Sequence, residues 1–262
     1  MLHAGGMSTD TFAQADAPAT AATTIVAVAG LHRRYGDGAA AVDALAGVDV
    51  AIRRGEFTAI MGASGSGKST LMHLMAGLDT PTSGTVTLDG VRLDELDDRR
   101  LTELRRDKVG FIFQAFNLLP VLTAEENLVL PLTIAGRKPD PAWLESLVQA
   151  VGLGDRRTHR PSEMSGGQQQ RVAVARALVT RPAVVFADEP TGNLDSVAST
   201  DVLVLLRRAV DDFDQTVVMV THDAASASYA DRLIVLADGR IAHDGPAGST
   251  EEVIDVMKAV AS

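Results

Sequence analysis

A glycine-rich stretch at residues 62–70, GASGSGKST, has the residue types and spacing for phosphate chemistry. Gly62, Gly67, Lys68 and Ser69 satisfy the pattern G-x-x-x-x-G-K-[ST]. In such a loop the glycines let backbone N–H groups surround phosphate oxygens, the lysine adds positive charge, and the serine hydroxyl ligates magnesium. The stretch follows a β-rich run, EFTAIM, and precedes the helical spacing LMHLMAGL. This context indicates a nucleotide phosphate site rather than a chance glycine turn.

A second candidate lies far along the chain, where the apolar run VVFA ends in Asp188 and Glu189. A carboxylate at the end of such a strand can hold magnesium through its water shell, and the next residue can polarise an attacking water. The alternative is two solvated loop carboxylates. Four apolar residues directly before the pair, in a chain with a phosphate loop, favour the functional interpretation.

A second short glycine turn, MSGGQQQRVAVARAL at residues 164–178, opens directly into a helical pattern. Gly166 and Gly167 expose N–H groups at the positive end of that helix, which suits an anion. Ser165 could serve as an ordinary N-cap, and capping is compatible with a phosphate contact. Since one nucleotide needs one cradle, the second loop requires a separate explanation.

The elements that must position these residues can be read from the pattern of apolar runs. Strands are expected at residues 56–61, 84–90, 109–113, 183–188, 216–220 and 232–238. Residues 118–179 read as mostly helical, with breaks at Pro120 and at residues 136–141 and 152–161. A charged helix with a solvated face is expected at residues 98–106, and a last helix from Ser249 or Thr250. Strands separated by helices predict parallel βα units, hence an α/β fold.

Composition narrows the class of protein. The 262 residues, 46% of them hydrophobic, suffice for one substantial core or a core with a subdomain attached. With 24 Lys+Arg against 34 Asp+Glu, the net charge of −10 is a poor match for a nucleic-acid backbone. The absence of cysteine removes disulfides, thiolate zinc sites and thiol catalysis. No apolar run approaches the roughly 18 residues of a membrane span.

The first residues differ in texture from the rest. Residues 1–24 are rich in Ala, Thr and Gly, contain Asp10 and Asp16, and lack the basic start of a signal peptide. We expect a disordered lead-in there, with translation beginning at Met1 or at Met7, followed by a single domain over residues 25–262. Nothing in the pattern points away from a cytoplasmic location.

Taken together, these motifs resemble the nucleotide-binding domain of ABC transporters over nearly all of residues 25–245. The run SGGQ at residues 165–168 matches the signature loop, with Met164 where leucine is usual. Gln114 falls at the Q-loop position, TGNLDS matches the D-loop with Asp195, and His222 matches the switch histidine. Tyr35 matches the aromatic that stacks on adenine. Asp195 could instead cap the next helix, and Tyr35 could be a surface aromatic.

The resemblance implies a fold and a set of site residues. It implies a P-loop NTPase with a mostly parallel core sheet, an antiparallel β subdomain and a helical signature-loop subdomain at about residues 115–180. Catalytic roles fall on Glu189, His222 and Gln114, and magnesium ligation on Ser69, Gln114 and Asp188. Nucleotide contacts fall on Tyr35, Gly62, Ser64, Gly65, Gly67, Lys68, Ser69, Thr70, Ser165, Gly166, Gly167, Gln168 and Asp195.

It also implies what the chain works with. ATP and Mg²⁺ are the expected cofactors, and the signature loop would contact the γ-phosphate held by a second copy in a head-to-tail dimer. Stretches such as FIFQAFNLLP and ADEPTGNLDS are similar to the lipoprotein-releasing, macrolide-exporting and cell-division ATPases. That subgroup implies a separate permease with few membrane helices and a large extracytoplasmic region, contacting residues 116–134. A soluble ABC ATPase of DNA repair or translation is the alternative, although no nucleic-acid partner is expected.

Overall fold

The chain folds around two sheets, and a computed structural model describes residues 24–261. One sheet has the order β10-β9-β3-β8-β7-β6, and the other has the order β2-β1-β4-β5. The strands are β1 (Thr24–Tyr35), β2 (Val42–Arg53), β3 (Phe57–Gly62), β4 (Ser83–Leu88), β5 (Val91–Arg92), β6 (Val109–Phe113), β7 (Val184–Asp188), β8 (Val217–Val220), β9 (Arg232–Ala237) and β10 (Arg240–Pro246). The helices are α1 (Lys68–Met75), α2 (Asp98–Lys108), α3 (Ala124–Ile134), α4 (Pro141–Ala150), α5 (Gly166–Leu178), α6 (Ser196–Phe213), α7 (Ala224–Ala227) and α8 (Thr250–Ala261).

The six-stranded sheet is parallel from β9 to β6, and β10 joins its edge in the antiparallel direction. The central strands are buried along almost their whole length, as expected for a parallel sheet covered on both faces. The strands predicted from continuous apolar runs are confirmed within one or two residues. β10 was not predicted, because its alternating exposure leaves no apolar run.

The four-stranded sheet is antiparallel, and β1 and β2 are each 12 residues long with several register shifts between them. The sequence patterns predicted only its β4 strand. β1 begins at Thr24, one residue inside the predicted lead-in. The remainder of that lead-in, residues 1–23, lies outside the described residues.

Two hydrophobic cores lie on opposite faces of the six-stranded sheet. Side chains alternate between the faces of a strand, so neighbouring residues of one strand enter different cores. Ala59 of β3 and Ala187 of β7 belong to the core beneath α3–α8. Ile60 and Phe186, one residue away, belong to the core shared with α1 and the antiparallel sheet. The central strands therefore hold both halves of the molecule.

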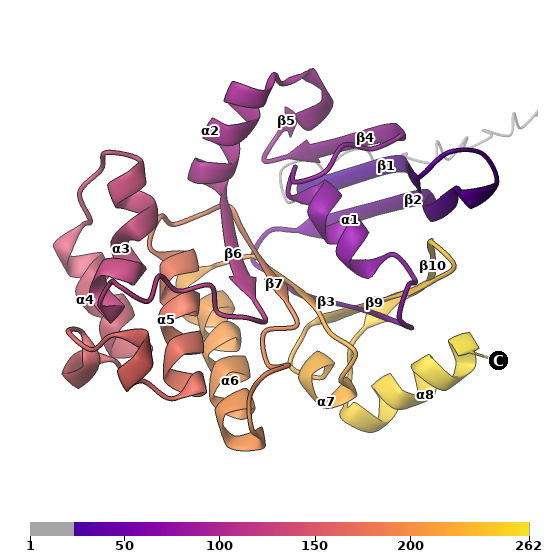
Figure 1. The fold of residues 1–262 in the computed structure, drawn as a ribbon. Helices are drawn as coiled ribbons and strands as arrows, with labels where there is room; N and C mark the ends of the chain where they lie inside the picture. Colours follow the sequence, from indigo (N-terminus) through magenta and orange to yellow (C-terminus); the bar gives the residue numbers. More distant parts are fainter. Residues whose placement is uncertain (1–23, 262) are drawn as a thin grey trace, which may run out of the picture.

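Helices α3, α4 and α5 form the side of the molecule opposite to the antiparallel sheet (Figure 1). Each begins at a side-chain cap, provided by Thr123, Asp140 and Ser165 respectively. The breaks predicted at Pro120 and at residues 152–161 are present, and the segments that are not α-helical extend over 118–123 and 151–165. α2 has no buried residues, as its charge run predicted. No helix in the described part of the chain is long and apolar enough to cross a membrane.

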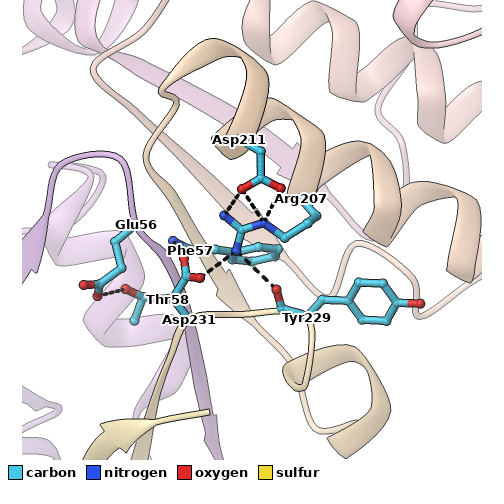
Figure 2. Close-up of polar contacts among 7 residues, drawn as sticks. All are labelled: Glu56, Phe57, Thr58, Arg207, Asp211, Tyr229 and Asp231. Atoms are coloured by element: carbon cyan, nitrogen blue, oxygen red, sulfur yellow. Dashed lines mark hydrogen bonds and ion pairs between the residues drawn. The ribbon is translucent and has the colours of Figure 1, made fainter. Parts of the chain in front are cut away.

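Helix α6 is fixed to the end of the sheet by Arg207, shown in Figure 2. Its guanidinium group donates to Asp211 on the same helix and, at 3.0 Å, to Asp231 just before β9. Asp231 also accepts a hydrogen bond from the backbone N–H of Phe57, at 2.8 Å, and Arg207 lies over the Phe57 ring. α6 is therefore tied to the first residue of β3.

Candidate functional site

Several of the predicted polar residues follow strands that end at one edge of the parallel sheet. Asp188 at the end of β7 is in register with Phe113 of β6 on one side and Val220 of β8 on the other. Val220 in turn is paired with Ile60 of β3. Because carboxyl ends of parallel strands share an edge, the residues that follow these strands lie together.

The glycine-rich loop leaves β3 at this edge and enters α1. Gly62 has φ 147° and Gly67 has φ 102°, values that favour glycine. A Cβ at Gly62 would collide with the carbonyl oxygen of Leu236, and one at Gly67 with that of Ala44. Ser64, Gly65 and Ser69 are exposed, and no side chain caps the first turn of α1. The loop thus presents backbone N–H groups at a helix N-terminus, which fits a phosphate group.

Lys68 completes the loop electrostatically. Its ammonium group donates to the carbonyl oxygens of Gly62 and Ala63 at 2.9 and 2.8 Å. Burial lowers the pKa of Lys68, and the nearby carboxylates of Glu189 and Asp188 act in the opposite direction. The lysine therefore lies between the loop and the carboxylates at the end of β7.

Asp188 is half-buried. Burial is the largest cause that raises the pKa of its carboxyl group. His73 and Lys68 lower that pKa, and Glu189 raises it. An anionic side chain with incomplete charge compensation is suited to a cation, because a bound cation offsets the cost of desolvation. Asp188 thus has the chemistry of a cation ligand.

Glu189 has an unusual backbone conformation. Its φ of 46° lies in the left-handed region, where a non-glycine residue is strained by about 1 kcal/mol or more. The Glu189 N–H donates to the carbonyl oxygen of Val220 at 2.9 Å. A hydrogen bond of 2.9 Å joins Nδ1 of His222 to Oε1 of Glu189. The structure therefore brings the predicted switch histidine directly onto the predicted catalytic carboxylate.

Gln114 is held by a residue that the sequence patterns did not single out. Its side-chain amide donates to Oδ1 of Asn193 at 3.2 Å, and Asn193 donates back to the Gln114 carbonyl oxygen at 3.0 Å. A Cβ at Gly192 would lie 2.7 Å from the Gln114 amide nitrogen, so this docking requires glycine there. We call residues 114–119 the Q-loop; in this structure Gln114 contacts the D-loop region.

Two residues of α5 hold the Q-loop and the segments next to it. Gln170 donates to the carbonyl oxygens of Phe113 and Pro190, and Arg176 donates to those of Phe116 and Asn117. Gln170 lies in the run QQQ, yet residue spacing alone does not reveal a partner 57 residues away.

The second glycine turn begins α5. Ser165 accepts from the Gln168 N–H and Gln168 accepts from the Ser165 N–H, a capping box. Ser165 is therefore an N-cap, as the alternative interpretation predicted, and these two hydrogen bonds fix the shape of the turn. A Cβ at Gly167 would lie 2.9 Å from the Ala198 side chain, so α5 packs closely against α6. The turn is built independently of the first glycine loop.

Asp195 and Tyr35 have structural contacts of their own. Asp195 caps α6 by accepting from the N–H groups of Val197 and Ala198. The Tyr35 hydroxyl donates to Asp79 at 2.6 Å, and Arg33 lies over its ring at 4.4 Å. Asp195 is therefore the helix cap of its alternative interpretation. Arg33 covers one face of the Tyr35 ring.

Among residues 24–261, no three His, Cys, Asp or Glu side chains are grouped to hold a metal ion by themselves. The predicted magnesium ligands are a serine, a glutamine and one aspartate. Such a set fits a cation that takes its other ligands from phosphate oxygens and water, as Mg²⁺ prefers.

The fold and this edge define a nucleotide-binding P-loop protein, and comparison with known proteins narrows the class. Residues 45–192 match the family model described as ABC transporter. A lipoprotein-releasing system ATP-binding protein, LolD of Shewanella frigidimarina, is 45% identical, covering 84% of this chain and 95% of the relative. The macrolide export ATP-binding/permease protein MacB of Marinobacter nauticus is 47% identical over 82% of this chain and 33% of its own length.

A solved structure supports the same assignment. It is described as a dimeric post-hydrolysis state of the ATP-binding cassette MJ0796 bound to ADP and Pi, and it matches with a TM-score of 0.76 and 40% identity. The match covers 85% of this chain and 99% of that one. The chain belongs to the ABC transporter ATP-binding family, and it is a nucleotide-binding ATPase of that family.

Proposed function

We propose that the chain is the ATP-hydrolysing subunit of an ABC transporter, working as a head-to-tail dimer around two ATP and driving a separate membrane permease. The observation that carries this proposal is the set of groups at one sheet edge: the glycine loop with Lys68, the half-buried Asp188, and Glu189 bonded to His222. In this proposal the second glycine turn, at the start of α5, binds the nucleotide held by the other copy of the chain.

Each residue has a stated role in the proposal. The loop residues Gly62, Ser64, Gly65, Gly67, Lys68, Ser69 and Thr70 bind the phosphates, and Tyr35 stacks on adenine. Magnesium, which neutralises phosphate charge when bound, is held through Ser69, Gln114 and Asp188. Glu189 polarises the attacking water, and His222 orients Glu189 and contacts the γ-phosphate. Ser165, Gly166, Gly167 and Gln168 reach the partner's nucleotide, and Asp195 lies across the dimer interface.

The permease contact is proposed at a groove between α3, β6 and α5, near residues 116–134. The groove has a volume of about 390 Å³ and is lined in part by Phe111, Phe113, Leu130 and Ile134. Ile134 is 74% exposed, so an apolar side chain is available at its rim. This surface suits an amphipathic helix from a permease, and such binding would place the chain at the cytoplasmic face of the membrane. The transporter relatives favour this role over DNA repair or translation.

The catalytic part is tested with Glu189→Gln, sized in solution with Mg²⁺ and ATP. Loss of the carboxylate should slow hydrolysis by about 100-fold or more while leaving nucleotide binding intact, so an ATP-bound dimer accumulates. Glu103→Gln, on the exposed face of α2, is the matched control and should turn over ATP normally. A Glu189→Gln protein that remains monomeric at saturating ATP, with or without permease, would contradict the shared-site dimer.

The transport part is tested by affinity purification of the tagged chain from detergent-solubilised membranes. A stoichiometric permease with few membrane helices and a large outer region is the expected companion. Recovery with ribosomal or nucleic-acid partners alone would refute the transport role while leaving the ATPase assignment intact.

A further inference from the structure

Gln170 is a fully buried polar side chain inside α5, one turn after Gly166. Its amide nitrogen donates to the carbonyl oxygen of Pro190 at 2.6 Å and to that of Phe113 at 3.3 Å. Its amide oxygen is buried and has no partner in the described part of the chain. A buried amide with an unsatisfied oxygen costs free energy, so stability alone gives a weak reason for glutamine here.

The two carbonyl groups that accept from Gln170 lie next to two of the proposed catalytic residues, at the ends of neighbouring strands. Phe113 is the last residue of β6 and directly precedes Gln114. Pro190 directly follows Glu189 at the end of β7. A single amide from the helix of the second glycine turn therefore bridges the ends of both strands.

The bond to Pro190 acts on a strained residue. Glu189 has a positive φ, and a residue before proline is in addition steered toward extended conformations. The N–H of Gly192 donates to the Glu189 carbonyl oxygen at 3.0 Å, which closes a turn around Pro190. With the Gln170 bond removed, the Pro190 carbonyl is released and the Glu189 backbone can relax toward an extended conformation. That relaxation would move the carboxylate away from His222.

We propose that Gln170 is a positioning residue for hydrolysis: through Pro190 it holds the Glu189 carboxylate in its working orientation and ties it to α5, the helix that begins with the second glycine turn. This inference rests on the proposed role of Glu189. It differs from that role because Gln170 acts through the backbone carbonyl groups of Phe113 and Pro190.

The chain provides a matched control in Gln215. This residue is 7% exposed, and its amide nitrogen donates to the carbonyl oxygens of Pro182 and Thr216, both at 3.2 Å. Gln215 thus makes the same kind of bonds, including one to a proline carbonyl. These bonds lie before the first residues of β7 and β8, away from the strand ends that carry the site. Gln170→Leu and Gln215→Leu both delete two such bonds at similar volume, so their effects on stability should be comparable.

The experiment compares both variants for unfolding, for affinity toward a non-hydrolysable ATP analogue, and for kcat and KM. We expect Gln170→Leu to lower kcat by about 100-fold, as a misplacement of about 1 Å does, with analogue affinity within about twofold of the parent. Gln215→Leu should keep the parent kcat. If Gln170→Leu retains the parent kcat, or if both variants lose it equally, the positioning role is wrong.

A double variant separates this inference from the proposed function. In a Glu189→Gln background, Gln170→Leu should cause no further fall in kcat, because the group that it positions is already lost. A further fall of about 100-fold would show that Gln170 acts elsewhere. A Glu189→Gln protein with parent activity would instead overturn the role of Glu189 itself. Gln170→Met, unbranched and of similar length, carries the same test if the leucine variant does not fold.

Discussion

Replacing Arg176 by methionine should release the Q-loop without unfolding the protein. Arg176 is on α5, and its guanidinium group donates to the carbonyl oxygens of Asn117 and Phe116 at 2.6 and 2.8 Å. Both acceptor residues have left-handed backbones, with φ of 51° and 58°. The arginine therefore holds in place a strained pair of residues just after Gln114.

The magnitude follows from the bonds and the burial. A hydrogen bond to a charged group contributes about 1.5–3 kcal/mol net, and two are lost. Burial lowers the pKa of Arg176, a sign that desolvating its charge offsets part of this gain. A net loss of about 2 kcal/mol in the free energy that opens the Q-loop corresponds to about 30-fold faster local opening. Methionine keeps the apolar stem contacts, so the global stability should change less.

The assay is amide hydrogen exchange followed by mass spectrometry of peptides that cover residues 114–119. Protected amides there include that of Leu119, which donates to the Asn127 side chain at 2.8 Å. Arg181→Met is the control, because Arg181 is an exposed cation just beyond α5 that pairs with Asp140 and lies over Trp143. Exchange in the Q-loop that is equal in Arg176→Met and the parent protein would refute the reasoning.

Two further predictions concern protons. Burial raises the pKa of Asp188, so the ionised carboxylate destabilises the folded state at neutral pH. Asp188→Asn should therefore raise the melting temperature, and it should remove Mg²⁺-dependent nucleotide binding. Calorimetry at decreasing pH should show that the parent protein binds Mg²⁺-nucleotide more weakly as the pH falls through that raised pKa. Mg²⁺-dependent binding that persists in Asp188→Asn would contradict a role of Asp188 as a ligand. Hydrogen bonds from Arg232 lower the pKa of Asp244, so this pair stabilises the fold above the unfolded-state value of about 3.9 and loses its contribution as pH falls through the folded value. Asp244→Asn should therefore cost about 1–2 kcal/mol in urea unfolding at pH 7 and progressively less as the pH falls through the folded pKa, whereas a cost that does not change with pH would contradict the linkage.

The sequence predicted the parallel sheet and the edge of the site well, because these depend on local signals. The run VVFAD is apolar up to the residue where β7 ends, and the loop after β3 needs glycines at fixed spacing. The antiparallel sheet was harder to predict, since β1 and β2 are interrupted by register shifts that break the alternation of exposed and buried residues. β10 was missed because every second residue is exposed, which leaves no continuous apolar run.

The contacts that connect the motifs could not be predicted from spacing. Gln114 meets Asn193 at a separation of 79 residues, and Gln170 reaches Pro190 across 20. Each residue type is common at the surface, and its partner is a backbone carbonyl or another amide without a sequence signature. The pairing of β6 with β7 brings Gln114 to Asn193, and the packing of α5 against the ends of these strands brings Gln170 to Pro190. Burial of Gln170 was likewise invisible in a run of three glutamines.

The alternation of the central strands between two cores has a consequence for how the chain tolerates insertion and deletion. Ala187 and Phe186 enter opposite cores. One residue added within β7 would therefore put phenylalanine in the place of alanine in one core and alanine in the place of phenylalanine in the other. The same slip would carry Asp188 past the register with Phe113 and Val220 that brings it to the edge. Length variation among related sequences should accordingly be confined to the connections, such as residues 36–41 and 136–140, and be absent from the strands. In this chain the strand register that fills the two cores also sets the position of the site residues.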